Sequence, residues 1–250
     1  MRIVGEDLGG FNHYEHGVDV VRWLEDVYQS PGAGNIPGLN LTPETVEIIF
    51  KHTFFRKEER HFAQQTLAKS TKHGDLRKDC SCHLEGQAVR IADKISYLIS
   101  DLEDGIRMGV IDLPALMRCR FFERPPIDMV PQADESLYER FISQRGAILK
   151  VVMEDVITTT DYRLAKIPSI EAVRKHIDYL IDYSPSVSAD LAENWRELQS
   201  GRLHKAPAVL EANSRATRIV SDLFFWFCLQ PQLVEPISGE HTEGYTIACI

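Results

Sequence analysis

Apolar side chains recur at three- and four-residue steps through most of the chain, the spacing of helices that bury one face. The pattern is clearest over residues 84–109. There, at about 100° per residue, an aliphatic stripe lies roughly opposite a polar one. The aliphatic stripe holds Ile91, Ile95, Leu98, Leu102 and Ile106, and the polar stripe holds Arg90, Asp93, Tyr97, Asp101 and Asp104. The pattern predicts a long helix that packs through one stripe and presents the other to water or to a ligand.

The same periodicity predicts further helices and almost no strands. We expect a helix that starts at Pro43 after a capping Thr42. Other helices are predicted over 18–29, 58–69, 113–119, 135–161, 170–183, 187–199 and 208–229. Proline and glycine at 30–38 end the first of these, and the proline-rich stretch 124–134 marks an internal boundary. The fold class predicted is an all-α multi-helix bundle.

Length and composition are those of a globular protein. A chain of 250 residues that is 44% hydrophobic and 26% charged can bury a core of its own. The net charge of -9 argues against nonspecific binding of nucleic acid, which needs clustered Lys and Arg. No apolar run approaches the roughly 18 to 20 residues of a membrane span, and the N-terminus lacks a signal-peptide layout. We therefore expect a cytoplasmic protein without a membrane partner.

The cysteines indicate reduced thiols. There are five, an odd number, scattered along the chain. Cys80, Cys82 and His83 form a local cluster that could offer ligands to zinc. Structural zinc uses four ligands, and no second half-site is visible. The interpretation we favour for this cluster is a loop before a helix.

Three segments, in the same order, resemble the deoxynucleoside triphosphate triphosphohydrolases, the dGTPase branch of the HD-domain phosphohydrolases. They are GGFNHYEHGVDVVRWLE at 9–25, GLNLTPETVEIIFKH at 38–52 and LEGQAVRIADKISYLISDLEDGIRMG at 84–109. The third resembles the family helix that supplies the last metal-binding aspartate. The resemblance implies a partial phosphohydrolase core over 1–120, a C-terminal phosphohydrolase-associated helical region over 121–236, and a tail over 237–250.

The resemblance also implies roles for individual residues. Asp93 would be a metal ligand, Lys94 and Tyr97 would contact the triphosphate and the sugar, and Asp101 would contact the sugar. Arg145 lies in a helix similar to one that reaches the nucleotide. The alternative for the acids and Arg145 is a solvated helix face, and for Tyr97 it is a place in the core.

Two catalytic candidates lie near the N-terminus. His13 matches a histidine near the scissile phosphate, and Glu6 is similar to an acid that partners such a histidine. His52 could serve a site or simply end a helix.

Most of the family metal site has no counterpart in the chain. The family holds its divalent metal, Mg²⁺ or Mn²⁺, with a histidine, an adjacent His-Asp pair and a distant aspartate. No His-Asp dipeptide occurs in the 250 residues, so only Asp93 remains. We expect the N-terminal part of the core to be missing and the isolated chain to be inactive, because one carboxylate does not hold a catalytic ion stably.

Two interpretations follow. In the first, the chain belongs to an enzyme that in its complete form hydrolyses a deoxynucleoside triphosphate to a deoxynucleoside and triphosphate. The missing ligands then come from a complementing N-terminal polypeptide or were lost. In the second, the chain is a noncatalytic subunit for nucleotide binding or assembly. In either case we expect it to form oligomers.

Overall fold

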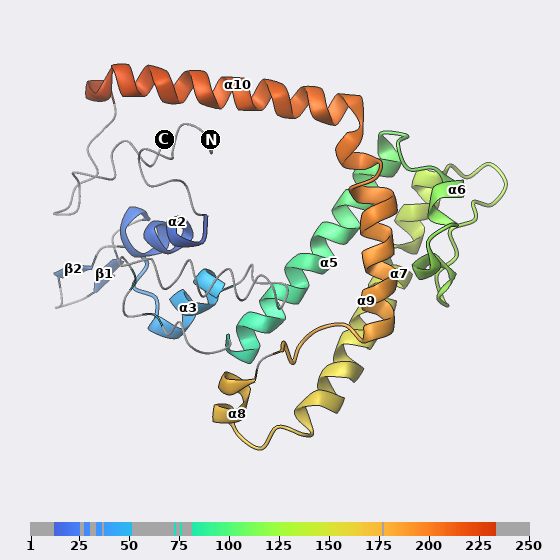
Figure 1. Cartoon of the computed structure of the whole chain (residues 1–250), viewed down its shortest axis with the longest axis horizontal. Coiled ribbons are helices and arrows are strands. Elements are labelled where there is room, and N and C mark those ends of the chain that lie inside the picture. Colours follow the sequence, from blue (N-terminus) through green and yellow to red (C-terminus); the bar gives the residue numbers. More distant parts are fainter. Residues whose placement is uncertain are drawn as a thin grey trace. The chain divides into compact units, whose positions relative to one another are not determined.

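The computed structural model describes residues 13–25, 28–30, 34–36, 38–51, 73, 76, 82–176 and 178–233. The chain divides into two compact units (Figure 1). One consists of Met1–Phe50 with Leu210–Ile250, and the other of Lys51–Val209. The described elements are overwhelmingly helical, which confirms the all-α class. No helix in these ranges is both long and apolar enough to cross a membrane. The family-derived regions 1–120, 121–236 and 237–250 remain predictions.

The N-terminal part of the first unit, up to Phe50, holds two helical segments and a short hairpin. Helix α2 (His13–Asp19) continues into a π-helical turn, η1 (Val20–Leu24). Strands β1 (Tyr28–Ser30) and β2 (Gly34–Ile36) pair antiparallel, with Gln29 opposite Asn35. The predicted helix over 18–29 is therefore wrong at both ends. The proline and glycine between the strands favour a reversal, and the residues on either side then pair with each other instead of continuing a helix.

The backbone conformation at position 38 explains why the GLNL sequence begins with glycine. Its φ is +71°, and a Cβ there would lie 2.3 Å from the carbonyl oxygen of Arg22. Only glycine tolerates both the left-handed backbone and this approach. The next residue, Leu39, donates its N–H to the carbonyl of Val21, and α3 (Pro43–Lys51) follows. Thr42 accepts from the N–H of Thr45 at 3.4 Å, as its predicted capping role requires.

The second unit is organised around two long helices that lie side by side, α5 (Leu84–Arg107) and α7 (Leu137–Leu164) (Figure 1). All five aliphatic side chains of the predicted stripe are buried, in a core shared with Phe141, Ile148 and Val152 of α7. Helix α7 begins with a capping box, in which Ser136 and Glu139 each bond the other's backbone N–H. The amphipathic reading of 84–109 is confirmed on its apolar side.

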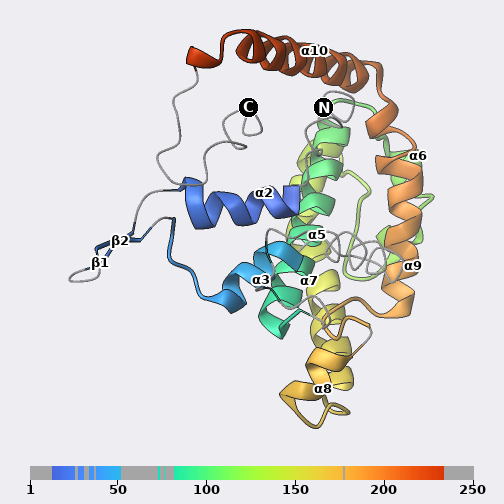
Figure 2. The ribbon, with the colours of Figure 1, turned by 60° about the vertical axis from the view of Figure 1, so that its left-hand side comes forward.

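Shorter elements complete this unit. They are α6 (Leu113–Leu116), η2 (Arg120–Glu123), α8 (Ile170–Lys175), α9 (Pro185–Asn194), the π-helical η3 (Trp195–Gln199) and η4 (Leu203–Lys205). The two views agree that α8 lies at the opposite end of the unit from α6 (Figure 2). Helix α10 (Pro207–Leu229) and the short η5 (Pro231–Leu233) follow.

The single helix predicted over 170–183 is wrong, because α8 ends at Lys175. Residues 178–184, here called the α8–α9 loop, follow an irregular path instead. Side chains of α5 and α7 bind the backbone of this loop, and those hydrogen bonds replace the ones that a helix would have made.

Candidate functional site

The candidate site is a stretch of α5 on which four predicted residues follow one another over two helical turns. Asp93, Lys94, Tyr97 and Asp101 span about 12 Å along the helix axis. Asp93 and Lys94 are partly exposed, and Tyr97 is 63% exposed. Tyr97 is therefore not a core residue. Within the second unit, this stretch of α5 is open to a ligand or to water.

Just before this stretch, the α8–α9 loop covers the polar stripe. Arg90 was expected on the open face, but it is only 1% exposed, so that prediction is wrong. One of its Nη atoms donates to the carbonyl of Ile181 and pairs with the carboxylate of Asp182, both at 2.9 Å. Its guanidinium also lies 3.7 Å from the centroid of the Tyr179 ring. The α8–α9 loop covers Arg90, and this contact fixes the loop beside the first turns of α5.

Gln87, one turn earlier, binds the same loop through its amide. Its Oε1 accepts from the backbone N–H groups of Leu180 at 2.8 Å and Ile181 at 3.1 Å. Its Nε2 donates to the carbonyl of Cys82 at 3.1 Å. The side chain is fully buried, and these bonds satisfy both ends of its amide. The loop is thus held to α5 by two consecutive turns of the helix.

At the end of the open stretch, Asp101 is held by a residue far along the chain. The Nε2 of Gln199, in η3, donates to a carboxylate oxygen of Asp101 at 3.0 Å. Burial raises the pKa of Asp101, and the hydrogen bond from Gln199 and the charge of His204 oppose that rise. A carboxylate accepts more than one hydrogen bond, so Asp101 can still accept from a ligand hydroxyl.

Arg145 on α7 lies beside the C-terminal half of α5, joined to it by an ion pair. Its Nη2 is 2.9 Å from a carboxylate oxygen of Glu103. Glu103 also accepts from Arg107 and from the hydroxyl of Tyr138. Arg107 pairs with Asp104 as well, so two guanidinium groups and two carboxylates balance in this cluster. The Arg145 side chain is 42% exposed, and its contact with substrate remains a prediction.

The N-terminal candidates belong to the other unit. His13 is the first residue of α2 and its side chain is exposed. Glu6 and His52 lie outside the described residues. The proximity of His13 and Glu6 to Asp93 is thus still a prediction.

A metal site is not complete in the part of the chain that the structure describes. In that part, no three His, Cys, Asp or Glu side chains come together in a group that could hold an ion. Asp93 supplies one carboxylate, whereas divalent cations take several protein ligands or waters in defined geometry. The described residues alone therefore do not fit the divalent metal that the sequence resemblance implies.

The cysteine cluster does not supply a metal site either. Cys82 is buried and His83 is the residue before α5, while Cys80 lies outside the described ranges. A zinc site here would need ligands from elsewhere in the chain.

Two site residues had no place in the sequence prediction. Gln199 lies 98 residues from Asp101, and no local pattern could connect them. Glu103 could have been noticed through its i, i+4 spacing to Arg107, but its role as the partner of Arg145 needs the packing of α7 on α5.

No family model matches the chain, but individual relatives do. It is 30% identical over 236 residues to a deoxyguanosinetriphosphate triphosphohydrolase-like protein of Cereibacter sphaeroides, an alignment that covers 92% of this chain and 59% of the relative. It is 28% identical over 250 residues to a protein of the same name from Allorhizobium ampelinum, covering 96% and 60%. A third relative, from Rickettsia canadensis, is 28% identical over 227 residues, covering 87% and 56%. The chain spans somewhat under two thirds of the length of these relatives.

Proposed function

Because the chain belongs to the deoxyguanosinetriphosphate triphosphohydrolase-like family, we propose that the open stretch of α5 is part of a site for a deoxynucleoside triphosphate. In its complete form, this site would hydrolyse the nucleotide to a deoxynucleoside and triphosphate. The observation that supports the proposal is the accessibility of Asp93, Lys94 and Tyr97 on a helix whose other stripe is buried in the core.

Each side chain of the open stretch has a chemical use in such a site. The ammonium of Lys94 would offset phosphate charge, and the hydroxyl of Tyr97 would give one directional donor. Asp101, oriented by Gln199, would accept a hydrogen bond from a sugar hydroxyl. Arg145 would add a guanidinium at the edge of the site. Asp93 would contribute one carboxylate to a divalent metal, Mg²⁺ or Mn²⁺, whose other ligands lie outside the described residues or on another polypeptide.

His13 and Glu6 complete the proposal. An imidazole near the scissile phosphate would donate a proton to the departing oxygen, and the carboxylate of Glu6 would hold that imidazole in position.

A second candidate function is a noncatalytic subunit that binds nucleotide or assembles with an intact partner. It is favoured by the sequence, which has no His-Asp dipeptide. Both candidates use the open stretch of α5 for a nucleotide, and they differ in whether hydrolysis can be restored.

Binding and hydrolysis should therefore be measured separately. With Mn²⁺ and dGTP, the purified chain is expected to release no triphosphate. Turnover by the chain alone that Asp93→Ala abolishes would contradict the expected lack of a complete metal site. Lys94→Gln is expected to weaken dGTP binding by about tenfold, the effect of one charge-assisted hydrogen bond. The matched control is Lys150→Gln, since Lys150 is exposed on α7 beside Glu154.

The two candidates can be separated by complementation. The part of the Cereibacter sphaeroides relative that this chain does not span would be added in trans, and triphosphate release measured. Release that Asp93→Ala removes would support the hydrolase. Binding of dGTP without release would support the noncatalytic subunit, and the absence of dGTP binding under all these conditions would contradict both.

A further inference from the structure

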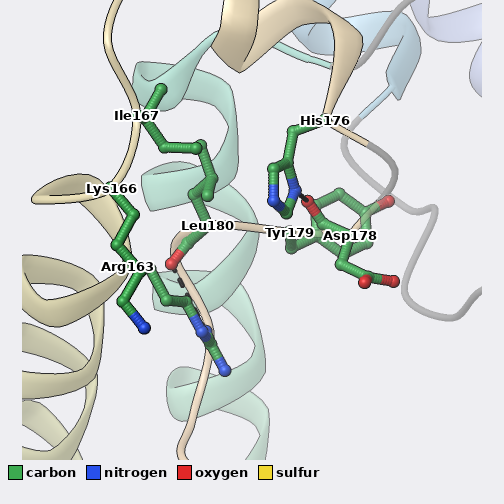
Figure 3. A pocket seen from close by; sticks show the side chains of 7 residues that line it. All are labelled: Arg163, Lys166, Ile167, His176, Asp178, Tyr179 and Leu180. Atoms are coloured by element: carbon green, nitrogen blue, oxygen red, sulfur yellow. Dashed lines mark hydrogen bonds between the residues drawn. The ribbon is translucent and has the colours of Figure 1, made fainter.

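A cavity lies in the Lys51–Val209 unit, and its described lining residues include none from α5. It is formed by the end of α7, the residues after α8 and the start of the α8–α9 loop, and its volume is about 310 Å³ (Figure 3). Its lining residues are Arg163, Lys166, Ile167, His176, Asp178, Tyr179 and Leu180. The volume is at the lower end of the range for small-molecule sites, which is larger than a single inorganic ion requires.

Two permanent positive charges line one side of the cavity. Arg163 donates to the backbone carbonyls of Leu180 at 3.3 Å, Asp182 at 3.0 Å and Tyr183 at 2.9 Å. These acceptors are neutral, so they fix the guanidinium in place without cancelling its charge. Two of its five N–H groups remain for another acceptor.

Lys166 adds the second charge, two residues beyond the end of α7 at Leu164. Its Nζ lies 3.7 Å from the centroid of the Tyr162 ring, a contact that orients the ammonium without neutralising it. Among the described residues, neither Lys166 nor Arg163 forms an ion pair with a carboxylate. The cavity is therefore positively charged on this side and suited to bind an anion.

The opposite side is formed by His176 and Asp178. The Nδ1 of His176 lies 2.7 Å from the carbonyl oxygen of Asp178, which places the proton of a neutral ring on Nδ1. Asp178 is the one acid among the described residues of the lining. Figure 3 shows its carboxylate beyond the His176 ring, away from Arg163 and Lys166.

We propose that this cavity binds a small phosphate ester. The dianionic phosphate would lie against Arg163 and Lys166, whose two charges it matches and whose N–H groups its oxygens can accept. The organic part would contact the apolar side chains of Ile167 and Leu180. This site is independent of the nucleotide site proposed on α5.

The test is a calorimetric titration of the full chain with phenyl phosphate, with benzoate and orthophosphate as comparison ligands. We expect saturable binding of phenyl phosphate that is tighter than binding of either comparison ligand. Benzoate carries the same ring on a carboxylate, and equal affinity for it would overturn the phosphate assignment. Equal affinity for orthophosphate would overturn the ester assignment, and so would the absence of saturable binding at millimolar phenyl phosphate.

Variants locate the binding in this cavity. Lys166→Gln is expected to weaken phenyl phosphate binding by about tenfold, and Lys166→Arg to retain it. Lys150→Gln, on the exposed surface of α7, should leave the affinity unchanged. An equal loss in Lys166→Gln and Lys150→Gln would overturn the proposal. Lys94→Gln distinguishes this site from the one on α5: phenyl phosphate affinity should be unaffected, and a loss there would assign the ligand to the α5 site instead.

Discussion

The side-chain amide of Gln199 donates a hydrogen bond to the carboxylate of Asp101 at 3.0 Å, between residues 98 positions apart. Gln199 is buried at the end of the π-helical η3, and Asp101 lies on the polar stripe of α5. The bond ties the end of α9 and η3 to the edge of the proposed nucleotide site. The orientation of one candidate substrate contact thus depends on a distant helix.

Asp101→Asn is expected to stabilise the fold at neutral pH. Burial raises the pKa of Asp101 in the folded state, so the folded state is more stable when this carboxyl is protonated than when it is ionised. That contribution is complete below the ordinary pKa of 3.8 and is lost as the pH rises through the raised value. Asparagine keeps an acceptor for Gln199 and carries no charge, so the unfolding free energy at pH 7 should increase.

Urea unfolding at several pH values checks this prediction. The stability of the wild-type protein relative to Asp101→Asn should fall as the pH rises from about 4 towards 7. A constant difference across this range would contradict it. Gln199→Leu serves as the companion variant, because loss of its hydrogen bond should raise the pKa of Asp101 further.

Arg90→Met is expected to destabilise the second unit by about 3 to 5 kcal/mol, because it leaves Asp182 without its buried partner. It also removes the hydrogen bond to the Ile181 carbonyl and the contact with the Tyr179 ring. Arg215→Met is the control, since Arg215 pairs with Glu211 on the exposed surface of α10 and should matter by less than about 0.5 kcal/mol. Similar urea midpoints for both variants would show that Arg90 does not anchor the α8–α9 loop.

The cysteines should differ sharply in reactivity. Cys119 is fully buried, and burial raises the pKa of its thiol to about 11. Cys228 on α10 is exposed. In the native protein at pH 8, iodoacetamide should therefore modify Cys119 on the order of 100-fold more slowly than Cys228.

Peptide mapping by mass spectrometry gives both rates in one experiment. In denaturing urea the two thiols should react alike, which controls for intrinsic reactivity. Rapid native labelling of Cys119 would mean that its surroundings open on the timescale of the reaction.

The apolar side of α5 could be predicted because five aliphatic residues repeat over many turns and all face one core. The polar side was predicted less well. Arg90 lies on the same predicted stripe as Asp93, but the α8–α9 loop covers it. Sequence periodicity carries no information about a loop residue, Ile181, that is 91 positions away. A buried arginine of this kind is recognisable only from its tertiary partners.

The short elements were predicted wrongly for a different reason. The strands β1 and β2 have three residues each, too few for the alternation that identifies a strand. The helix expected over 170–183 was lost to side-chain bonds from Gln87, Arg90 and Arg163, which compete with helical hydrogen bonds for the same backbone groups. The family resemblance singled out Asp93, Lys94, Tyr97 and Asp101, which lie on one stretch of α5. It did not predict that Gln199 binds Asp101.

Assembly of the chain is the last prediction, and it concerns α10. Ile219, Leu223 and Trp226 recur at four- and three-residue steps on this helix, and all three are exposed. Contiguous apolar surface of this kind favours association, so light scattering after size exclusion should give a mass above the monomer's 28.5 kDa.

Leu223→Glu should shift the protein towards the monomer, because association would bury a charge. Ser214→Glu, nine residues earlier and on the opposite side of the helix, should not change the mass. A monomeric wild-type protein at all concentrations, or an equal shift in both variants, would contradict a role for this face of α10.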